Sequence, residues 1–312
     1  MTANGRSGGW VLARRGGAVG LERRGARAAG AGEVAVRVAF AGICRTDVRA
    51  ADGELGVAEG RVLGHELGGT IAAVGAGVRG LAVGQTVSVD PRLACGRCVG
   101  CAAEEGCWRP EFLGVDRDGA FAEVLVVPAS AIVAVPAGLD LRLAAYVEPV
   151  AATLAIVEAG LPQAGVGVVV GRGRIAELAL LVLHAHGFSR ASLVDPAALV
   201  ETRGGLDFAI EAEASAALID AVVARLRPRG TLVVKSRALG RIPIDVGAVI
   251  AKELRVVGAC YGSFAAAAAL LASGRVDVRP LLGRARPLVE YAEALAEARA
   301  GEGQKLFFAM EG

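Results

Sequence analysis

The chain has 312 residues, a length that predicts about two domains. Its 34 Lys and Arg nearly balance 32 Asp and Glu, so the net charge of +2 gives no general electrostatic argument for binding nucleic acid or a membrane surface. Apolar residues make up 54% of the chain, which excludes wholesale disorder, and no apolar run approaches the roughly 20 residues of a membrane-spanning helix.

The first 30 residues are rich in Gly and Arg and predict a low-complexity linker. Residues 1–10 contain no apolar run and no cleavage pattern of a signal peptide. The protein is therefore expected in the cytoplasm, where thiols stay reduced.

From there to about residue 145, short alternating or β-rich segments are punctuated by glycines and predict a mostly β domain. The expected strands are Glu33–Ala39, Gly68–Gly75, Val83–Asp90 and Phe121–Pro128. No long amphipathic helix is predicted in this part of the chain.

The pattern then changes to strands that alternate with helices, which predicts an α/β domain with a doubly wound parallel sheet. The strands expected are Gly165–Gly171, Ala191–Asp195, Leu206–Glu211, Thr231–Lys235 and Leu254–Gly258. Helices are expected at Ile175–His186 and Ala216–Leu226. A last helix, Val289–Ala300, precedes a final strand, Gln304–Ala309.

Gly171-x-Gly173-x-x-Ala176 lies between a buried strand and a helix, the context in which this motif binds a dinucleotide pyrophosphate. Asp195 ends the next strand, where a carboxylate accepts hydrogen bonds from the adenosine ribose and repels a 2′-phosphate, which favours NAD over NADP. The alternative is a glycine turn without a ligand. Arg172 and Arg174 either assist the phosphates or indicate a different coenzyme pose.

Four of the six cysteines lie within 13 residues, at Cys95, Cys98, Cys101 and Cys107. In a reducing compartment this density predicts a closed, structural Zn²⁺ site rather than scattered buried thiols. A second set is Cys44, His65 and Glu148, three ligand types that would leave one zinc position open, as catalysis requires. Taken singly, each residue also has a structural interpretation: Cys44 as a buried thiol, His65 as a hydrogen-bonded core histidine and Glu148 as an acid at a helix N-terminus. His184 and His186 are interpreted as structural.

Together these motifs resemble the zinc-dependent medium-chain dehydrogenases/reductases, the superfamily of alcohol, sorbitol and threonine dehydrogenases. The matching segments stand in the family's order: Gly42–Asp47, Leu63–Glu66, Cys95–Cys107, Asp118–Glu123, Val147–Val150 and Gly171–Ala176. The resemblance covers essentially the whole chain. It implies a GroES-like domain, 1–146 and 276–312, that carries both zinc sites, and a Rossmann NAD-binding domain, 147–275.

The resemblance also implies catalytic roles. Cys44, His65 and Glu148 match the catalytic zinc ligands, with either Glu148 or the neighbouring Glu66 bound directly. Thr46 matches the hydroxyl that begins proton release from the alcohol. Asp47 matches the carboxylate that orients the zinc histidine.

For the coenzyme, the resemblance implies contacts from two groups of residues. One group surrounds the glycine-rich turn: Gly171, Gly173, Ile175, Ala176 and Asp195. The other supplies cations to the phosphates: Arg45 and Lys305. The implied reaction oxidises a secondary alcohol of polyol, sugar or amino-alcohol type to a ketone, or the reverse, in a homodimer or homotetramer that binds neither nucleic acid nor membrane.

The chain departs from the family pattern at three points. The Cys101–Cys107 spacing is shorter than usual, and Arg49 stands where some relatives carry a histidine. Only 11 residues separate Asp195 from Asp207, which predicts a Rossmann domain trimmed by roughly 25–30 residues.

Two rival hypotheses remain. The trimmed domain would suit a catalytically impaired, zinc-stabilised binder of the same fold. The cysteine cluster beside Arg92, Arg97 and Arg109 would suit a nucleic-acid zinc module, but Glu104, Glu105 and Glu111 interrupt that patch and no basic recognition helix follows.

Overall fold

The computed structural model describes residues 9–103, 106–201, 204–213, 215–301 and 303–310, so Glu104 and Glu105 lie outside the described residues. The chain divides into two compact units: 1–148 with 282–312, and 149–281. The sequence placed these borders after 146 and 275. No helix in the described ranges is long and apolar enough to cross a membrane.

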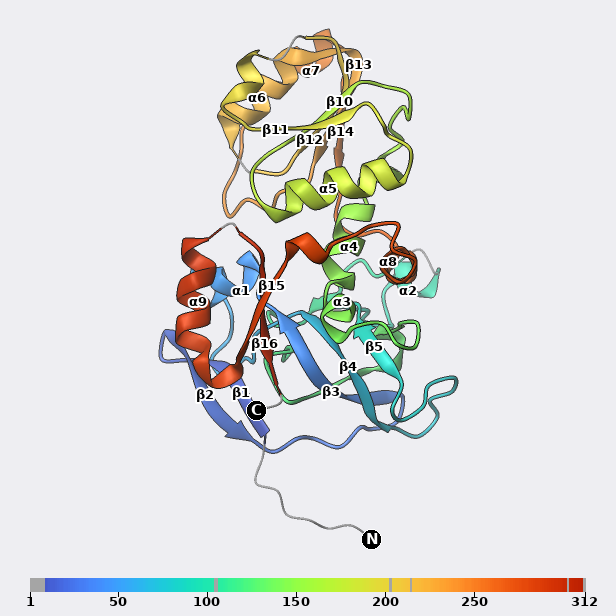
Figure 1. Cartoon of the computed structure of the whole chain (residues 1–312), viewed down its shortest axis with the longest axis vertical. Coiled ribbons are helices and arrows are strands. Elements are labelled where there is room, and N and C mark those ends of the chain that lie inside the picture. The colour runs from blue at the N-terminus through green and yellow to red at the C-terminus, as the bar shows by residue number, and fades with distance from the viewer. Residues whose placement is uncertain (1–8, 104–105, 202–203, 214, 302, 311–312) are drawn as a thin grey trace. The chain divides into compact units, whose positions relative to one another are not determined.

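A seven-stranded sheet forms the centre of the first unit (Figure 1). Its order is β15-β16-β3-β4-β5-β9, and β8 pairs with β3. The strands are β3 (Glu33–Gly42), β4 (Glu66–Val74), β5 (Thr86–Val89), β8 (Val124–Pro128), β9 (Ile132–Ala134), β15 (Leu282–Pro287) and β16 (Lys305–Ala309). Because β16 pairs with β3, the C-terminal strand lies next to the strand that leads into Cys44.

The prediction of an N-terminal linker is wrong for residues 9–24, which form an antiparallel hairpin of β1 (Gly9–Arg15) and β2 (Ala18–Arg24). Gly16 and Gly17 both have positive φ, 56° and 85°, as a two-residue type I′ turn requires. Leu12 is fully buried, so the hairpin belongs to the core of this unit. The Gly-Gly pair was the local signal for it.

The helices of the first unit are short. They are α1 (Arg45–Ala51), α2 (Val99–Ala102), α3 (Leu141–Ala145), α9 (Tyr291–Ala300) and α4 (Val147–Leu154), which continues into the second unit. Two-residue strands, β6 (Arg92–Leu93) and β7 (Glu111–Phe112), flank the cysteine cluster. α9 begins two residues later than expected, because Leu288–Glu290 form a 3₁₀ turn after Pro287.

The second unit has five parallel strands in the order β11-β10-β12-β13-β14, which confirms the doubly wound α/β prediction. They are β10 (Gly167–Val170), β11 (Ala191–Val194), β12 (Leu206–Glu211), β13 (Leu226–Val234) and β14 (Arg255–Gly258). Val169 and Ile210 face one core cluster, with α5 (Arg174–Ala185). Val168 and Ala209 face another, with α6 (Ala216–Arg225). The sheet is therefore covered on both faces.

Among its described residues, the connection from β11 to β12 contains a single 3₁₀ turn, Ala198–Glu201. β11 and β12 lie on opposite sides of β10, so this short segment makes the whole crossover. This is the short stretch between Asp195 and Asp207 from which the trimming of the Rossmann domain was predicted. The remaining helices are α7 (Val246–Ala251) and α8 (Phe264–Ala272), each begun by a side chain that caps its first turn, Asp245 and Ser263.

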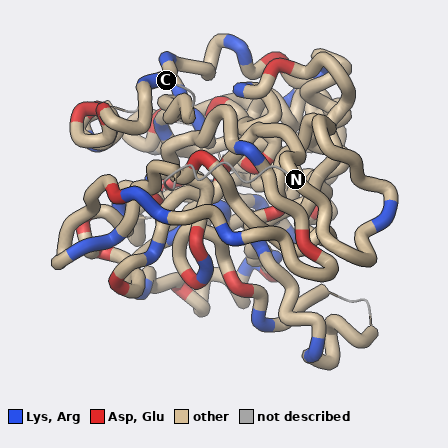
Figure 2. The backbone as a smooth tube through the Cα atoms, turned by 90° about the horizontal axis from the view of Figure 1, so that it is seen from below, with Lys and Arg blue, Asp and Glu red and all other residues tan. Residues whose placement is uncertain are grey.

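Basic and acidic residues are interspersed along the backbone (Figure 2). Arg92, one residue of the suspected basic patch, bonds to Asp90 with Nη2–Oδ2 at 2.8 Å. Neither feature favours the nucleic-acid alternative, which needs a continuous field of one sign.

Candidate metal centres and coenzyme turn

The first candidate centre is mostly buried, with Cys44 partly exposed, and it is assembled from distant parts of the first unit. Cys44 caps the start of α1, while His65 and Glu66 lie at the start of β4. Cys44 Sγ, a ring nitrogen of His65 and a carboxylate oxygen of Glu66 all lie within 4.8 Å of one another. His65 is 2% exposed and Glu66 is 1% exposed. Glu148, on α4, adds an Oε1 atom 4.0 Å from His65 Nε2.

Asp47 fixes two of these residues at once. Its Oδ2 accepts the backbone N–H of Cys44 at 2.9 Å, and its Oδ1 lies 3.0 Å from His65 Nδ1. A bond from Nδ1–H to Asp47 leaves the lone pair of His65 on Nε2, the arrangement of a metal-binding histidine. Burial lowers the pKa of His65, but the Asp47 carboxylate and the Cys44 thiol outweigh burial and raise that pKa well above its ordinary value.

Glu66 shows the clearest sign that this group suits a cation. Lys305 Nζ bonds to Glu66 Oε1 at 2.5 Å, in a pair that is almost completely buried. The other oxygen, Oε2, is buried and has no hydrogen-bond partner within the described residues. A buried carboxylate oxygen without a partner is costly, and beside a thiol and an imidazole it is an available metal ligand. These residues therefore fit Zn²⁺.

Sequence reasoning connected Lys305 with coenzyme phosphates and missed its partner Glu66, which is 239 positions away. It also missed Gly42, which makes room for the pair. A Cβ at Gly42 would lie 2.2 Å from Glu66 Oε2 and 2.8 Å from Lys305 Cε. The signal was available only in the pairing of β16 with β3, which brings Gly42 opposite Phe307.

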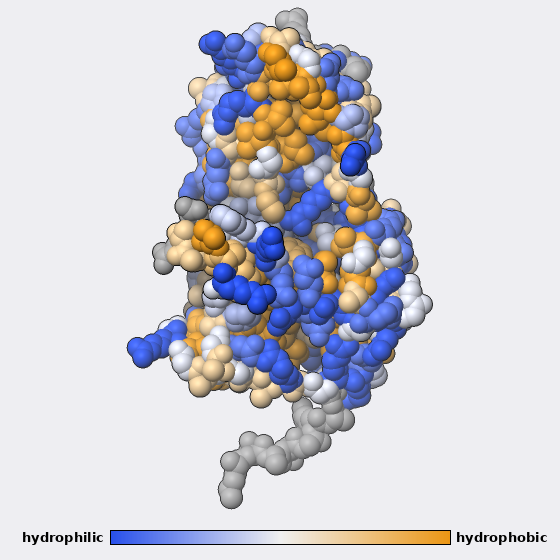
Figure 3. All heavy atoms as spheres, turned by 180° about the vertical axis from the view of Figure 1, so that it is seen from behind, coloured by the Kyte–Doolittle hydropathy of each residue, from blue (hydrophilic) through white to orange (hydrophobic). Residues whose placement is uncertain are grey.

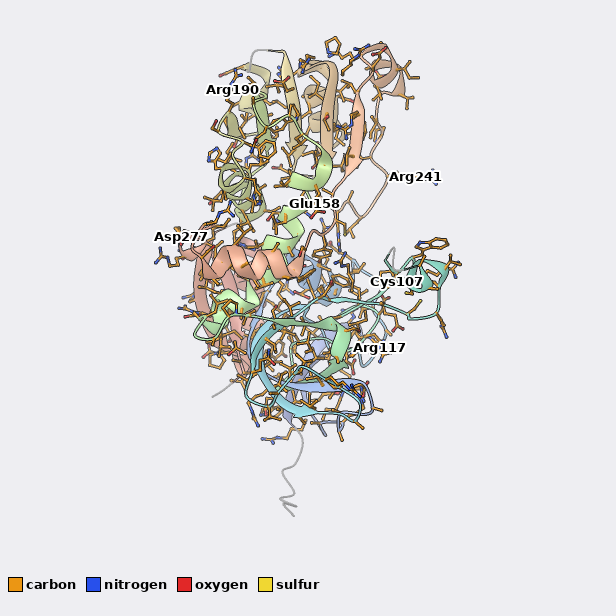
Figure 4. The ribbon with its side chains drawn as sticks, turned by 90° about the vertical axis from the view of Figure 1, so that its right-hand side faces the viewer. Cys107, Arg117, Glu158, Arg190, Arg241 and Asp277 are labelled. Carbon is orange, nitrogen blue, oxygen red and sulfur yellow. The ribbon has the colours of Figure 1, made fainter. Side chains whose placement is uncertain are left out.

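The second candidate centre is the half-exposed cluster of four cysteines, in a lobe at the edge of the first unit where Figure 4 labels Cys107. The Sγ–Sγ distances are 4.0 Å for Cys95–Cys101, 3.5 Å for Cys98–Cys101 and 3.9 Å for Cys98–Cys107. Four thiolates about 2.3 Å from one Zn²⁺ lie about 3.8 Å apart. The short Cys101–Cys107 spacing thus permits the geometry of a tetrahedral zinc site.

The four thiols differ in acidity. Backbone N–H groups of Trp108 and Cys101 lower the pKa of Cys98 to about 6. Desolvation and the neighbouring thiols of Cys98 and Cys107 raise the pKa of Cys101 to about 11. Without a cation, the four thiols would therefore not all be ionised at the same pH. A bound divalent cation favours the thiolate form of every ligand.

The glycine-rich turn lies in the second unit, between β10 and α5. Gly173 caps α5 with a φ of 79°, which favours glycine, and Ala176 is fully buried against the sheet. The α5 N-terminus therefore offers N–H groups to a phosphate. Asp195 follows β11 as predicted, and it forms a two-bond salt bridge with Arg172 that sequence reasoning did not foresee.

The remaining predicted residues take varied positions. Thr46 Oγ1 lies 3.9 Å from Cys44 Sγ, and Arg45 is exposed at the start of α1. Ile175 is 38% exposed in the first turn of α5. His184 Nε2 and His186 Nδ1 bond to backbone carbonyls of Ala191 and Val182, at 3.0 and 2.8 Å.

Comparison with known proteins places this geometry in a family. Residues 30–137 match the model of the alcohol dehydrogenase GroES-like domain. The chain is 31% identical over 299 residues to 2-dehydro-3-deoxy-L-galactonate 5-dehydrogenase of Pseudoalteromonas atlantica, across 85% of this chain and 88% of that protein. It is 30% identical over 319 residues to D-xylulose reductase A of Aspergillus niger, across 89% of each chain.

A crystal structure classed as a zinc-binding dehydrogenase, from Sinorhizobium meliloti 1021 and bound to NADP, has the same fold. The TM-score is 0.89 at 25% identity, across 96% of this chain and 98% of that one. The resemblance inferred from the motifs is thereby confirmed. The chain belongs to the zinc-type medium-chain dehydrogenases/reductases, and so to the oxidoreductases.

Proposed function

We propose that the protein transfers hydride between a secondary alcohol and a nicotinamide coenzyme, with zinc at the buried group of Cys44, His65, Glu66 and Glu148. The observation that carries this proposal is the partnerless Glu66 Oε2 beside a thiol and an oriented imidazole. The group combines one thiolate, one imidazole and one carboxylate, either Glu66 or Glu148. Such a set leaves a position open for substrate, unlike four cysteines.

Each residue of the group has its own task. Cys44 and His65 hold the ion, and Glu148 or Glu66 completes the site. Asp47 keeps His65 Nε2 directed at the ion through its bond to Nδ1. The Thr46 hydroxyl, next to Cys44, accepts the proton of the alcohol and passes it outward. Because Arg49 is not an acid–base group at neutral pH, the outer part of this path runs through water.

When bound, zinc supplies Lewis-acid polarisation that makes the alcohol more acidic, and the nicotinamide ring supplies the hydride chemistry. In the second unit, Gly171, Gly173 and the α5 N-terminus hold the pyrophosphate, with Ile175 and Ala176 in that first turn. Lys305 acts through Glu66, as the counter-ion of its Oε1.

The four-cysteine lobe would hold a second, structural zinc. Its four ligands leave no position for a substrate, so its task is to fix residues 95–107. A cytoplasmic location suits these ligands, since a reducing compartment keeps thiols available to metal.

The substrate class proposed is a polyol, sugar or sugar acid with a secondary hydroxyl. Two curated relatives named above act on a dehydro-deoxy-galactonate and on D-xylulose, which are ketone forms of such compounds. Every ligand candidate of the buried group is in place, which favours an active enzyme over the catalytically impaired alternative.

A substrate panel tests this proposal. Polyols, sugar acids, amino alcohols and aliphatic secondary alcohols would be offered with NAD or NADP while the absorbance of the reduced nicotinamide is followed. At least one secondary alcohol should give turnover that a chelator abolishes and zinc restores. Coenzyme binding without turnover on any member would support the impaired binder instead.

Self-association through the second unit is also proposed. β14 is an edge strand of its sheet, and an edge strand can pair with another chain. Nearby apolar side chains are exposed, at 63% for Val246, 71% for Ile250 and 41% for Val256, and a broad apolar area covers part of this unit (Figure 3). A homodimer would cover them, and light scattering of the purified protein measures it.

A further inference from the structure

A salt bridge joins the glycine-rich turn to the end of β11. Arg172, between the two glycines of the turn, directs Nε to Asp195 Oδ2 at 2.8 Å and Nη2 to Oδ1 at 3.1 Å. Oδ1 also accepts the backbone N–H of Ala197 at 2.8 Å. A carboxylate offers about four acceptor positions, so three of those on Asp195 are in use.

This occupancy bears on how the adenosine ribose is recognised. NAD-type recognition needs a carboxylate at this place to accept the ribose hydroxyls. With Arg172 in position, Asp195 has one acceptor position left for two hydroxyl donors. The two-hydroxyl contact therefore requires the guanidinium to move away, and Arg172 competes with the ribose of NAD.

The same guanidinium suits a 2′-phosphate. The side chains of Arg172 and Asp195 are 50% and 49% exposed, and exposed ion pairs contribute little to stability, so a phosphate can replace the carboxylate as the partner. Glu213 Oε1 lies 3.8 Å from Arg172 Nη1 and adds a second acid, while Arg174 adds a second base two residues along. The positive charge of Arg172 offsets the repulsion that a lone Asp195 would exert on a 2′-phosphate.

We propose that Arg172 determines coenzyme specificity: by holding Asp195 it weakens the selection for NAD, and it binds the 2′-phosphate of NADP, so that the protein uses both coenzymes. The sequence alone, which placed Asp195 correctly but not its partner, predicted a preference for NAD. The proposal rests on the proposed function, because it assumes that the turn binds a dinucleotide.

Two fragments that differ only in the 2′-phosphate, 5′-AMP and 2′,5′-ADP, test the proposal on the full chain by titration calorimetry. In the unaltered protein their dissociation constants should agree within about tenfold. Arg172→Gln should weaken the binding of 2′,5′-ADP by roughly 10- to 100-fold, because a charged hydrogen-bond donor is lost. The binding of 5′-AMP should be unchanged or tighter. NADPH and NADH titrations should show the same split.

Two further variants make the test specific. Arg190→Gln removes the same charge at the opposite end of β11, where Arg190 bonds to Ala164 O at 3.2 Å (Figure 4), and should alter neither fragment. Asp195→Asn removes the anion that holds Arg172. This variant should bind 5′-AMP more weakly, while 2′,5′-ADP binds as well as before or better.

Three results would overturn the proposal. The first is an equal loss of affinity for both fragments in Arg172→Gln, and the second is no change in either affinity. The third is a preference of more than about 100-fold for 5′-AMP in the unaltered protein. In each of these the dinucleotide site, and the proposed function, would stand. Failure of NADH and NADPH alike to bind the unaltered protein would instead overturn the proposed function together with this inference.

Discussion

The two candidate metal centres of the first unit are built in opposite ways. The four-cysteine centre takes all its ligands from one segment, residues 95–107, and its side chains are half exposed. The buried centre has its candidate ligands at residues 44, 65–66 and 148, and the supporting residues Asp47 and Lys305 are themselves buried. A local, closed set of ligands can fix a lobe, whereas a buried set assembled from distant strands can leave one position open for chemistry. Loss of each ion should therefore have a different consequence.

The largest expected effect is on catalysis through the buried centre. Cys44→Ser should lower turnover of the best panel substrate by about 1,000-fold or more, because several kcal/mol of transition-state stabilisation depend on the ion. Bound zinc should fall by one per chain. The matched control is Cys260→Ser, since Cys260 is exposed and bonded by Arg237 in the other unit. A Cys44→Ser protein with full turnover would exclude the proposed mechanism.

The next effect is on stability and concerns the counter-ion of Glu66. Lys305→Met should lower the free energy of unfolding by about 3 kcal/mol, because it leaves a buried carboxylate without its cation. Denaturant unfolding measures the change. The double variant Lys305→Met with Glu66→Gln should recover part of the loss. Additive effects of the two substitutions would mean that the buried pair is not coupled.

A smaller loss of stability is expected at the four-cysteine centre. Cys101→Ser should release the lobe zinc and lower the free energy of unfolding by about 2 kcal/mol. The variant should affect only this centre: limited proteolysis should cut within residues 95–107, while the zinc at Cys44 stays bound. Loss of both ions from this variant would show that the two centres are not independent.

The smallest effect should come from the residue that orients the histidine. Asp47→Asn removes the negative charge facing His65 Nδ1 and should weaken zinc binding by roughly 10- to 100-fold. Competition with a metal-sensitive dye measures the affinity. Asp52→Asn, at the end of the same helix where Asp52 pairs with Arg299, should leave that affinity unchanged. Equal effects of the two variants would assign Asp47 to helix capping only.

The sequence predicted much of the fold and candidate ligands for both metal centres, but only the four-cysteine set lies in one local pattern. The Cys95–Cys107 spacing defines its own ligand set, and the apolar run before Gly171 identifies β10 without help from distant residues. The short stretch between Asp195 and Asp207 likewise predicted the reduced crossover that the sheet order shows. These features depend on residues close together in the chain.

The contacts that sequence reasoning missed join distant residues. Lys305 meets Glu66 only because β16 pairs with β3 and β3 with β4. Arg172 meets Asp195 only because β10 and β11 are neighbours in the sheet. In each pair the cation occupies oxygen atoms of the carboxylate, so it determines which oxygens remain available to a ligand. Residue type and position predicted the acids, and the three-dimensional pairing defines what they can bind.

We propose above that the buried group holds a zinc ion distinct from that of the cysteine lobe. Anomalous X-ray scattering at the zinc absorption edge, measured on crystals of the unaltered protein, tests it most directly. We expect two peaks per chain, one among the four cysteines and one about 2.3 Å from Cys44 Sγ and about 2.0–2.1 Å from His65 Nε2. A zinc-loaded protein with a peak only in the lobe would show that Cys44 and His65 do not hold zinc.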